Sequence, residues 1–134
     1  MILRLAIEAD LEQIRTIINQ CSKELGYVRW PALREAIKKN CLILVEIEGK
    51  VIGFCHFRRV AGKGAVTISE IAVHTDWRKK GVGALLMSYF TQRIRLKTTA
   101  DNKAATGFYT ALGFHLVGQD KGNQRELNCW ERNN

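Results

Sequence analysis

The segment Arg78-Lys79-Lys80-Gly81-Val82-Gly83 constrains the fold more than any other feature of this chain. It follows residues 66–73, which read as a strand, and precedes residues 82–94, whose apolar positions recur at helical spacing. The first N–H groups of a helix have no internal partner and lie at its positive end, so such a turn attracts anions. Gly81 and Gly83 would let the backbone approach a phosphate closely. The segment therefore predicts a diphosphate site, with a merely solvated basic loop as the alternative.

The spacing of the glycines narrows the kind of diphosphate. A nucleoside-triphosphate loop of the form GxxxxGK[ST] is absent. A dinucleotide fingerprint needs a third glycine, and Leu86 stands in its place. The pattern present is RxxGxG, which resembles the pyrophosphate loop of the GNAT acetyltransferase superfamily. That resemblance implies acetyl-coenzyme A as the ligand.

A second motif strengthens the resemblance. The run Asn102-x-x-Ala105-x-x-Phe108-Tyr109-x-x-x-Gly113-Phe114 is similar to the GNAT signature NxxAxxFYxxxGF at every marked position. Both motifs occur in the family's order, and the resemblance extends from Ile2 to about Trp130. The chain is identified as a member of this superfamily. An acetyl-CoA-dependent N-acetyltransferase is expected, which transfers the acetyl group by direct attack of a primary amine in a ternary complex.

The pattern of elements agrees with that fold. A chain of 134 residues, 46% of them hydrophobic, suits one domain over residues 1–134. Strands are expected at residues 2–6, 41–46, 50–60, 66–73, 95–98, 115–117 and 125–130. Helices are expected at residues 9–19, after Pro31, and at residues 82–94 and 103–112, the last with Ala105, Phe108 and Leu112 facing inward. This order predicts a mixed α/β fold. The resemblance implies three layers, with about six or seven strands splayed between the fourth and fifth, and about four helices.

The resemblance also assigns residues to the cofactor. The main chain of Ile71, Ala72 and Val73 would pair with the pantetheine arm, as a strand pairs with an open sheet edge. The pyrophosphate loop would consist of Arg78, Lys79, Lys80, Gly81, Val82, Gly83 and Ala84. Asn102 would hydrogen-bond the pantetheine, cap its helix, or do both. Tyr109 would give a proton to the leaving thiolate.

The base that deprotonates the amine is less defined. Glu70 is the carboxylate of the central strand, but strand alternation separates it from Ser69 and Ile71. If the acceptor lies on the Ser69 face, Glu70 needs a bulge to act directly, or Thr67 and Ser69 order a water instead. His56 is the other candidate base, against a purely structural role. His74 is expected to cap the turn that follows its strand.

The acceptor stays open at this stage. Tyr27, Trp30 and Ser69 are candidate substrate-binding residues, although both rings could instead anchor their loop to the core. A small molecule or a protein is expected to supply the amine. The net charge of +8, from 21 basic and 13 acidic residues, suits the polyanionic cofactor and leaves a nucleic-acid-linked amine as an alternative. A non-catalytic acyl-CoA-binding module is a further alternative.

Cysteine usage and hydropathy indicate the compartment. Cys21, Cys41, Cys55 and Cys129 form no CxxC pair, so free thiols are expected rather than a metal site. No signal peptide and no apolar run of about 20 residues is evident, so we expect no membrane association. A cytoplasmic protein, monomeric or homodimeric, is the expectation.

Overall fold

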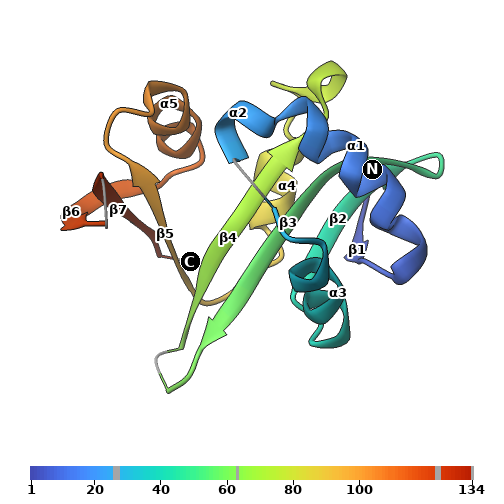
Figure 1. Cartoon of the computed structure of the whole chain (residues 1–134), viewed down its shortest axis with the longest axis horizontal. Coiled ribbons are helices and arrows are strands. Elements are labelled where there is room, and N and C mark those ends of the chain that lie inside the picture. Colours follow the sequence, from blue (N-terminus) through green and yellow to red (C-terminus); the bar gives the residue numbers. More distant parts are fainter. Residues whose placement is uncertain (26–27, 63, 123–124, 134) are drawn as a thin grey trace. The chain divides into compact units, whose positions relative to one another are not determined.

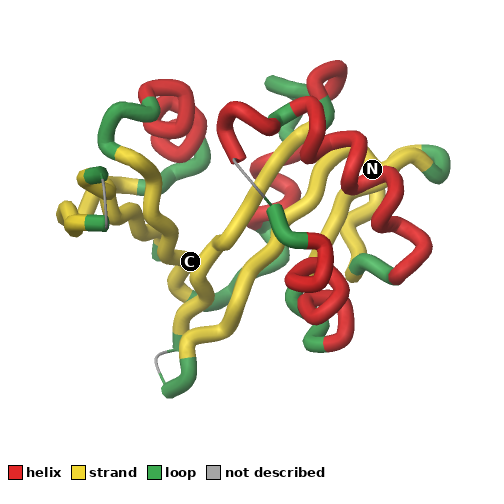
Figure 2. Tube along the Cα trace, in the orientation of Figure 1, coloured by secondary structure: helices red, strands yellow, loops and turns green. Residues whose placement is uncertain are grey.

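Figures 1 and 2 show the computed structural model, which describes residues 1–25, 28–62, 64–122 and 125–133. The strands are β1 (Ile2–Leu5), β2 (Leu42–Ile47), β3 (Lys50–Val60), β4 (Ala65–Val73), β5 (Arg93–Thr99), β6 (His115–Lys121) and β7 (Glu126–Arg132). The helices are α1 (Leu11–Gln20), α2 (Ser22–Leu25), α3 (Trp30–Lys38), α4 (Val82–Met87) and α5 (Lys103–Ala111). Two short 3-10 helices are η1 (Glu8–Asp10) and η2 (Thr75–Trp77). In the described part of the chain, no helix is long and apolar enough to cross a membrane.

The strands follow the order β1-β2-β3-β4-β5-β7-β6. The pairs β1–β2, β2–β3, β5–β7 and β6–β7 are antiparallel, whereas β4 and β5 are parallel over Ala65–Arg93, Val66–Ile94 and Thr67–Arg95. Glu48 and Gly49, with φ of 49° and 81°, form the tight two-residue turn between β2 and β3. The mixed sheet with flanking helices confirms the predicted α/β fold class.

The chain forms two compact units. The first comprises Met1–Arg58 and Ile68–Tyr89, and the second comprises Arg59–Thr67 and Phe90–Asn134. In the first unit, α1 and α3 lie on one face of the strands and α4 lies on the other (Figure 1). The largest fully buried side chains of this unit come from the strands and from α1, α3 and α4; they include Ile14, Leu33, Phe54, Phe57 and Leu86.

Gly53 brings α4 close to β3. A Cβ atom at this position would lie 2.7 Å from Cγ1 of Val82 and 3.5 Å from Cδ1 of Leu86, so only glycine leaves room for the helix. Four residues after Gly53, on the same face of β3, Phe57 is buried, and the centre of its ring lies 6.0 Å from that of Tyr89. The face that carries Gly53, Cys55 and Phe57 is thus the α4 face of the sheet.

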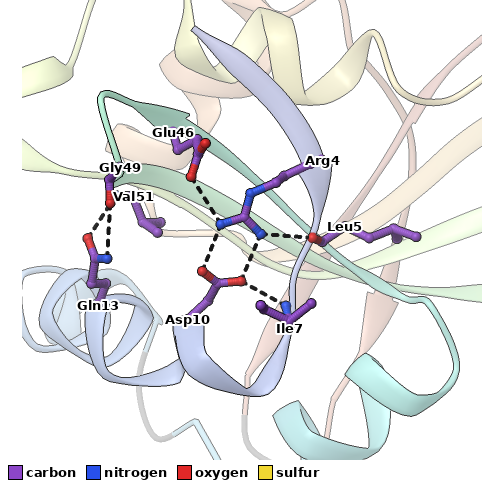
Figure 3. Close-up of polar contacts among 8 residues, drawn as sticks. All are labelled: Arg4, Leu5, Ile7, Asp10, Gln13, Glu46, Gly49 and Val51. Carbon is purple, nitrogen blue, oxygen red and sulfur yellow. Dashed lines mark hydrogen bonds and ion pairs between the residues drawn. The ribbon is translucent and has the colours of Figure 1, made fainter.

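A polar network fixes the beginning of the chain to β2 (Figure 3). The Arg4 guanidinium donates to both carboxylate oxygens of Asp10, at 2.9 and 2.8 Å, and to Glu46 at 3.0 Å. The Asp10 carboxylate also accepts the backbone N–H of Ile7 at 2.7 Å. These hydrogen bonds, with that from Arg4 the strongest, hold the pKa of the buried Asp10 carboxyl below its ordinary value.

The second unit has a smaller core. Ile94 and Leu96 of β5 are buried with Phe90, Phe114 and Trp130. The indole N–H of Trp130 donates to the hydroxyl of Thr98 at 3.0 Å, which satisfies the polar atom of a buried ring. β6, which lies at the end of the strand order, is exposed along its whole length.

Several predicted boundaries were wrong. The helix expected over residues 82–94 ends at Met87, because the Ser88 hydroxyl bonds back to the Leu85 carbonyl at 2.6 Å and Tyr89 closes a tighter i→i−3 turn on Leu86. Residues 93–99 then alternate with period two and form β5.

Other differences concern the last third of the chain and the linker after α1. β6 continues to Lys121 through the segment predicted as a loop, because Gly118 to Lys121 pair with β7 past a register shift. Ser22–Leu25 adds a short helix that we did not predict. The predicted inward stripe of α5, Ala105, Phe108 and Leu112, is half-buried rather than buried, since α5 contains no fully buried residue.

Candidate active site

The strand β4 ends in a tightly hydrogen-bonded turn. The Nδ1 atom of His74 accepts the N–H of Asp76 at 3.2 Å, so His74 caps η2 as predicted. Its other ring nitrogen lies 3.2 Å from the side-chain amide of Gln20, whose oxygen accepts the N–H of Thr75. His74 is buried, and its backbone N–H donates to the carbonyl of Ile52. Hydrogen bonds to α1, to β3 and between residues of the turn itself therefore fix the turn that precedes the basic loop.

The basic loop has a backbone path that suits an anion. Lys79 and Gly81 both adopt left-handed conformations, with φ of 61° and 84°. Gly81 is exposed and is the N-cap of α4; a Cβ there would meet nothing within 4 Å, so the space above its backbone is open. The N–H groups of the first turn of a helix have no helical partner. Lys80 adds an ammonium, which lies 5.1 Å from the centre of the Trp77 ring. These donors and cations fit a pyrophosphate.

Arg78, which begins the predicted pyrophosphate loop, makes contacts within the chain. Its Nε–H donates to the Val73 carbonyl at 3.4 Å, and its NH2 group lies 3.2 Å from Sγ of Cys21. Cys21 is buried and also contacts that carbonyl, at 3.9 Å. Arg78 thus ties the start of the loop to the end of α1. The sequence gives no signal of this contact, because it joins residues 57 positions apart.

The residues before the loop form part of the core. Ile71, Ala72 and Val73 are all buried, so their side chains belong to the core. Any role in binding the cofactor would therefore rest on their main chain.

The second unit carries the other predicted cofactor residues. The side-chain oxygen of Asn102 accepts the N–H of Ala105 at 3.0 Å, so Asn102 caps α5. Tyr109 lies in the last turns of this helix, and its ring makes edge-to-face contacts with Phe108 at 5.2 Å and Phe114 at 5.5 Å. Gly113, with φ of 88°, ends the helix and returns Phe114 to that ring. Packing on both sides fixes the orientation of the Tyr109 ring.

The two candidate bases lie together. Nδ1 of His56 on β3 is 2.5 Å from Oε2 of Glu70 on β4. Their side chains are 16% and 21% exposed, although Phe54, Ile68 and Ala72, which share their face by strand alternation, are buried. His56 is three positions from Gly53, so it points away from α4 and shares the face of α1 and α3 with Glu70. Burial, together with the Glu70 charge, raises the pKa of the Cys55 thiol, which therefore stays protonated.

The predicted acceptor residues lie in different settings. Trp30 begins α3 and packs under the guanidinium of Arg15, 5.5 Å from its ring centre. Ser69 is exposed on β4, on the face opposite Glu70. Tyr27 lies outside the described residues. The four cysteines are free, and the described residues contain no group of three or more His, Cys, Asp or Glu that could hold a metal ion.

Comparison with known proteins decides the family. Residues 38–116 match the model of the acetyltransferase (GNAT) domain. The peptidyl-lysine N-acetyltransferase YiaC of Escherichia coli is 31% identical over 104 residues, which cover 75% of this chain and 68% of that protein. The chain belongs to the GNAT acetyltransferase family.

Solved structures show the same fold. Ard1 from Thermoplasma volcanium superposes with a TM-score of 0.80 at 21% identity, over 98% of this chain and 95% of that one. The acetyltransferase yncA from Salmonella typhimurium, solved with acetyl-CoA, has a TM-score of 0.72 at 20% identity, over 98% and 92% of the two chains. As a GNAT member, the protein is an acetyl-CoA-dependent N-acetyltransferase, and acetyl-CoA is its acyl donor.

Proposed function

We propose that this GNAT enzyme acetylates the side-chain amine of lysine in peptides or proteins. The observation that carries the proposal is the partly exposed His56–Glu70 pair on a sheet face that is otherwise buried around it. A lysine amine has an ordinary pKa of about 10.4 and must lose a proton before it attacks a thioester. The pair provides a proton acceptor for that step. The similarity to a peptidyl-lysine N-acetyltransferase supports the acceptor class.

The cofactor-binding assignment is part of the proposal. The amides of residues 79–84 would hold the pyrophosphate, supported by the left-handed backbone at Lys79 and Gly81. The main chain of Ile71 to Val73 and the side chain of Asn102 would bind the pantetheine arm. Bound acetyl-CoA supplies the acetyl group as a reactive thioester. Tyr109, fixed by its aromatic neighbours, would protonate the departing sulfur.

The basic surface does not by itself favour a nucleic-acid acceptor. Arg93 lies 3.7 Å from Glu131, and Lys97 lies 2.7 Å from Asp120, so these two basic side chains are already paired with carboxylates. We infer that the remaining charge serves the polyanionic cofactor. A cytoplasmic location also belongs to this proposal, since that is where we expect acetyl-CoA and free thiols to coexist. Tight RNA or DNA binding that falls steeply with salt and survives saturation with coenzyme A would favour the nucleic-acid alternative instead.

A peptide panel tests the acceptor class. Three acceptors are each incubated with acetyl-CoA: an N-terminally blocked peptide with one lysine, a lysine-free peptide with a free N-terminus, and spermidine. Mass spectrometry should find the acetyl group on the lysine side chain of the blocked peptide, at a much higher rate than on the other two. Preferential acetylation of the free N-terminus or of spermidine would refute lysine as the acceptor.

A further inference from the structure

The pairing of His56 with Glu70 specifies which nitrogen of the imidazole can act. A carboxylate only accepts hydrogen bonds, so at 2.5 Å the Nδ1 atom of His56 carries a proton and donates a hydrogen bond to Oε2 of Glu70. In the neutral ring, Nε2 then keeps its lone pair. The ring is partly exposed, as the position of a base that meets a substrate requires.

We propose that Nε2 of His56 takes the proton of the acceptor amine, and that Glu70 is a positioning residue rather than the base. This inference rests on the proposed amine acetylation. In the step, the amine nitrogen bonds to the acetyl carbon and the C–S bond breaks. Before the attack, one proton of the protonated amine passes to Nε2 of His56. On C–S cleavage the sulfur takes the proton of Tyr109, and the second proton that the nitrogen loses on forming the amide returns to Tyr109. The products are the amide and the free thiol of coenzyme A.

The contact of Glu70 with His56 supports a positioning role for the carboxylate. Oε2 of Glu70 is occupied by the ring N–H of His56, and the pair holds the imidazole in one tautomer and one orientation. In other enzymes, a carboxylate likewise orients a histidine base and fixes its tautomer without itself taking the substrate proton. In this arrangement the basic nitrogen belongs to β3, the strand that carries His56, and the carboxylate that orients it belongs to β4.

Variants at the two positions separate the roles. The enzyme is assayed with whichever acceptor of the three-member panel it acetylates fastest. His56→Ala should lower kcat by about 10²- to 10⁴-fold, the usual loss for a general base, with little change in acetyl-CoA affinity. Added imidazole should restore part of that rate in a saturable manner. Glu70→Gln keeps an acceptor oxygen for the ring N–H, so it should lower kcat less than His56→Ala and gain nothing from imidazole.

Two further variants serve as controls, one for the loss of a histidine elsewhere and one for the folding of the His56 variant. His115→Ala removes an exposed histidine of β6 and should leave kcat and the response to imidazole unchanged. His56→Gln retains an N–H for Glu70 but lacks a basic nitrogen, so it serves if His56→Ala does not fold. Wild-type kcat in a folded His56 variant, or a larger loss in Glu70→Gln than in His56→Ala, would overturn the proposal.

An arm without acceptor distinguishes this inference from the proposed function. Long-range ¹H–¹⁵N NMR of the free enzyme should show neutral His56 with its proton on Nδ1, and Glu70→Gln should weaken that preference. A ring protonated on Nε2 would overturn the inference whatever the acceptor is. If the wild type acetylates none of the three amines while the NMR result holds, the proposed acceptor class has failed and the geometry of the pair has not.

Discussion

Gly53→Ala tests how the sheet positions the cofactor loop. The added methyl would lie 2.7 Å from Cγ1 of Val82, 3.2 Å from the Ala72 carbonyl oxygen and 3.5 Å from Leu86. The first contact is far inside van der Waals distance, so either α4 or β3 must move. Overpacking of this kind costs about 1–3 kcal/mol of the free energy of unfolding. Because Val82 directly follows Gly81, the shift should also weaken acetyl-CoA binding.

A double-mutant cycle isolates the clash. Val82→Ala alone removes buried methyl groups and should cost about 2 kcal/mol, from about 0.8 kcal/mol for each group plus the cavity left behind. In Gly53→Ala/Val82→Ala the new methyl occupies that cavity. The double variant should therefore lose at least about 1 kcal/mol less than the sum of the single variants.

Urea denaturation followed by circular dichroism measures these free energies, and calorimetric titration measures acetyl-CoA affinity. Gly118→Ala is the matched control, because a methyl there meets nothing within 4 Å and should change stability by less than about 0.5 kcal/mol. Additive losses in the cycle, or a fully stable Gly53→Ala, would show that Gly53 does not set the distance between α4 and β3.

Three further predictions concern the loop, the acid and the amino-terminal network. Gly81→Ala should weaken acetyl-CoA binding markedly more than Gly49→Ala. Both positions have φ above 80° and open surroundings, so the backbone strain of about 1 kcal/mol is the same in the two variants. Equal acetyl-CoA affinities by calorimetry would contradict the assignment of the pyrophosphate to the loop. Tyr109→Phe should lower kcat by about 10²- to 10⁴-fold with acetyl-CoA affinity retained, and unchanged steady-state turnover would exclude its hydroxyl as the acid. The Arg4 hydrogen bonds lower the pKa of Asp10, so its stabilisation is present above the ordinary carboxyl pKa of about 3.9 and is lost as the pH falls. Asp10→Asn should lower the free energy of unfolding by about 2 kcal/mol at pH 7 and by less in acid. If urea titrations give the same loss of unfolding free energy at every pH, this linkage is wrong.

Local patterns predicted the elements that depend on local chemistry. The break between the strands predicted at residues 41–46 and 50–60, the cap at Asn102 and the end of the helix predicted at residues 103–112 each follow from residue types whose preference is set within a few positions. The basic loop was likewise evident from its glycines and from the strand and helix runs around it.

Long-range contacts explain what was missed. The contact between Arg78 and Cys21 was not predicted, because Cys21 comes from a helix end far away in the sequence. His56 and Glu70 were weighed as separate bases, yet a signal for their pairing existed. They lie equally far from residue 63, inside the turn predicted between their strands, and positions equidistant from a hairpin turn face each other. The early end of α4 depended on the Ser88 back-bond, which helical periodicity alone does not reveal.

Direct transfer to a lysine amine is the central claim, and rapid-quench intact-mass spectrometry tests it most directly. The enzyme is mixed with acetyl-CoA and an equimolar N-terminally blocked peptide that carries one lysine, and the masses of protein and peptide are followed together. The peptide should gain one acetyl group for each coenzyme A released, while the mass of the protein stays constant throughout. An acetylated protein that precedes the acetylated peptide, or release of coenzyme A without peptide acetylation, would contradict the account.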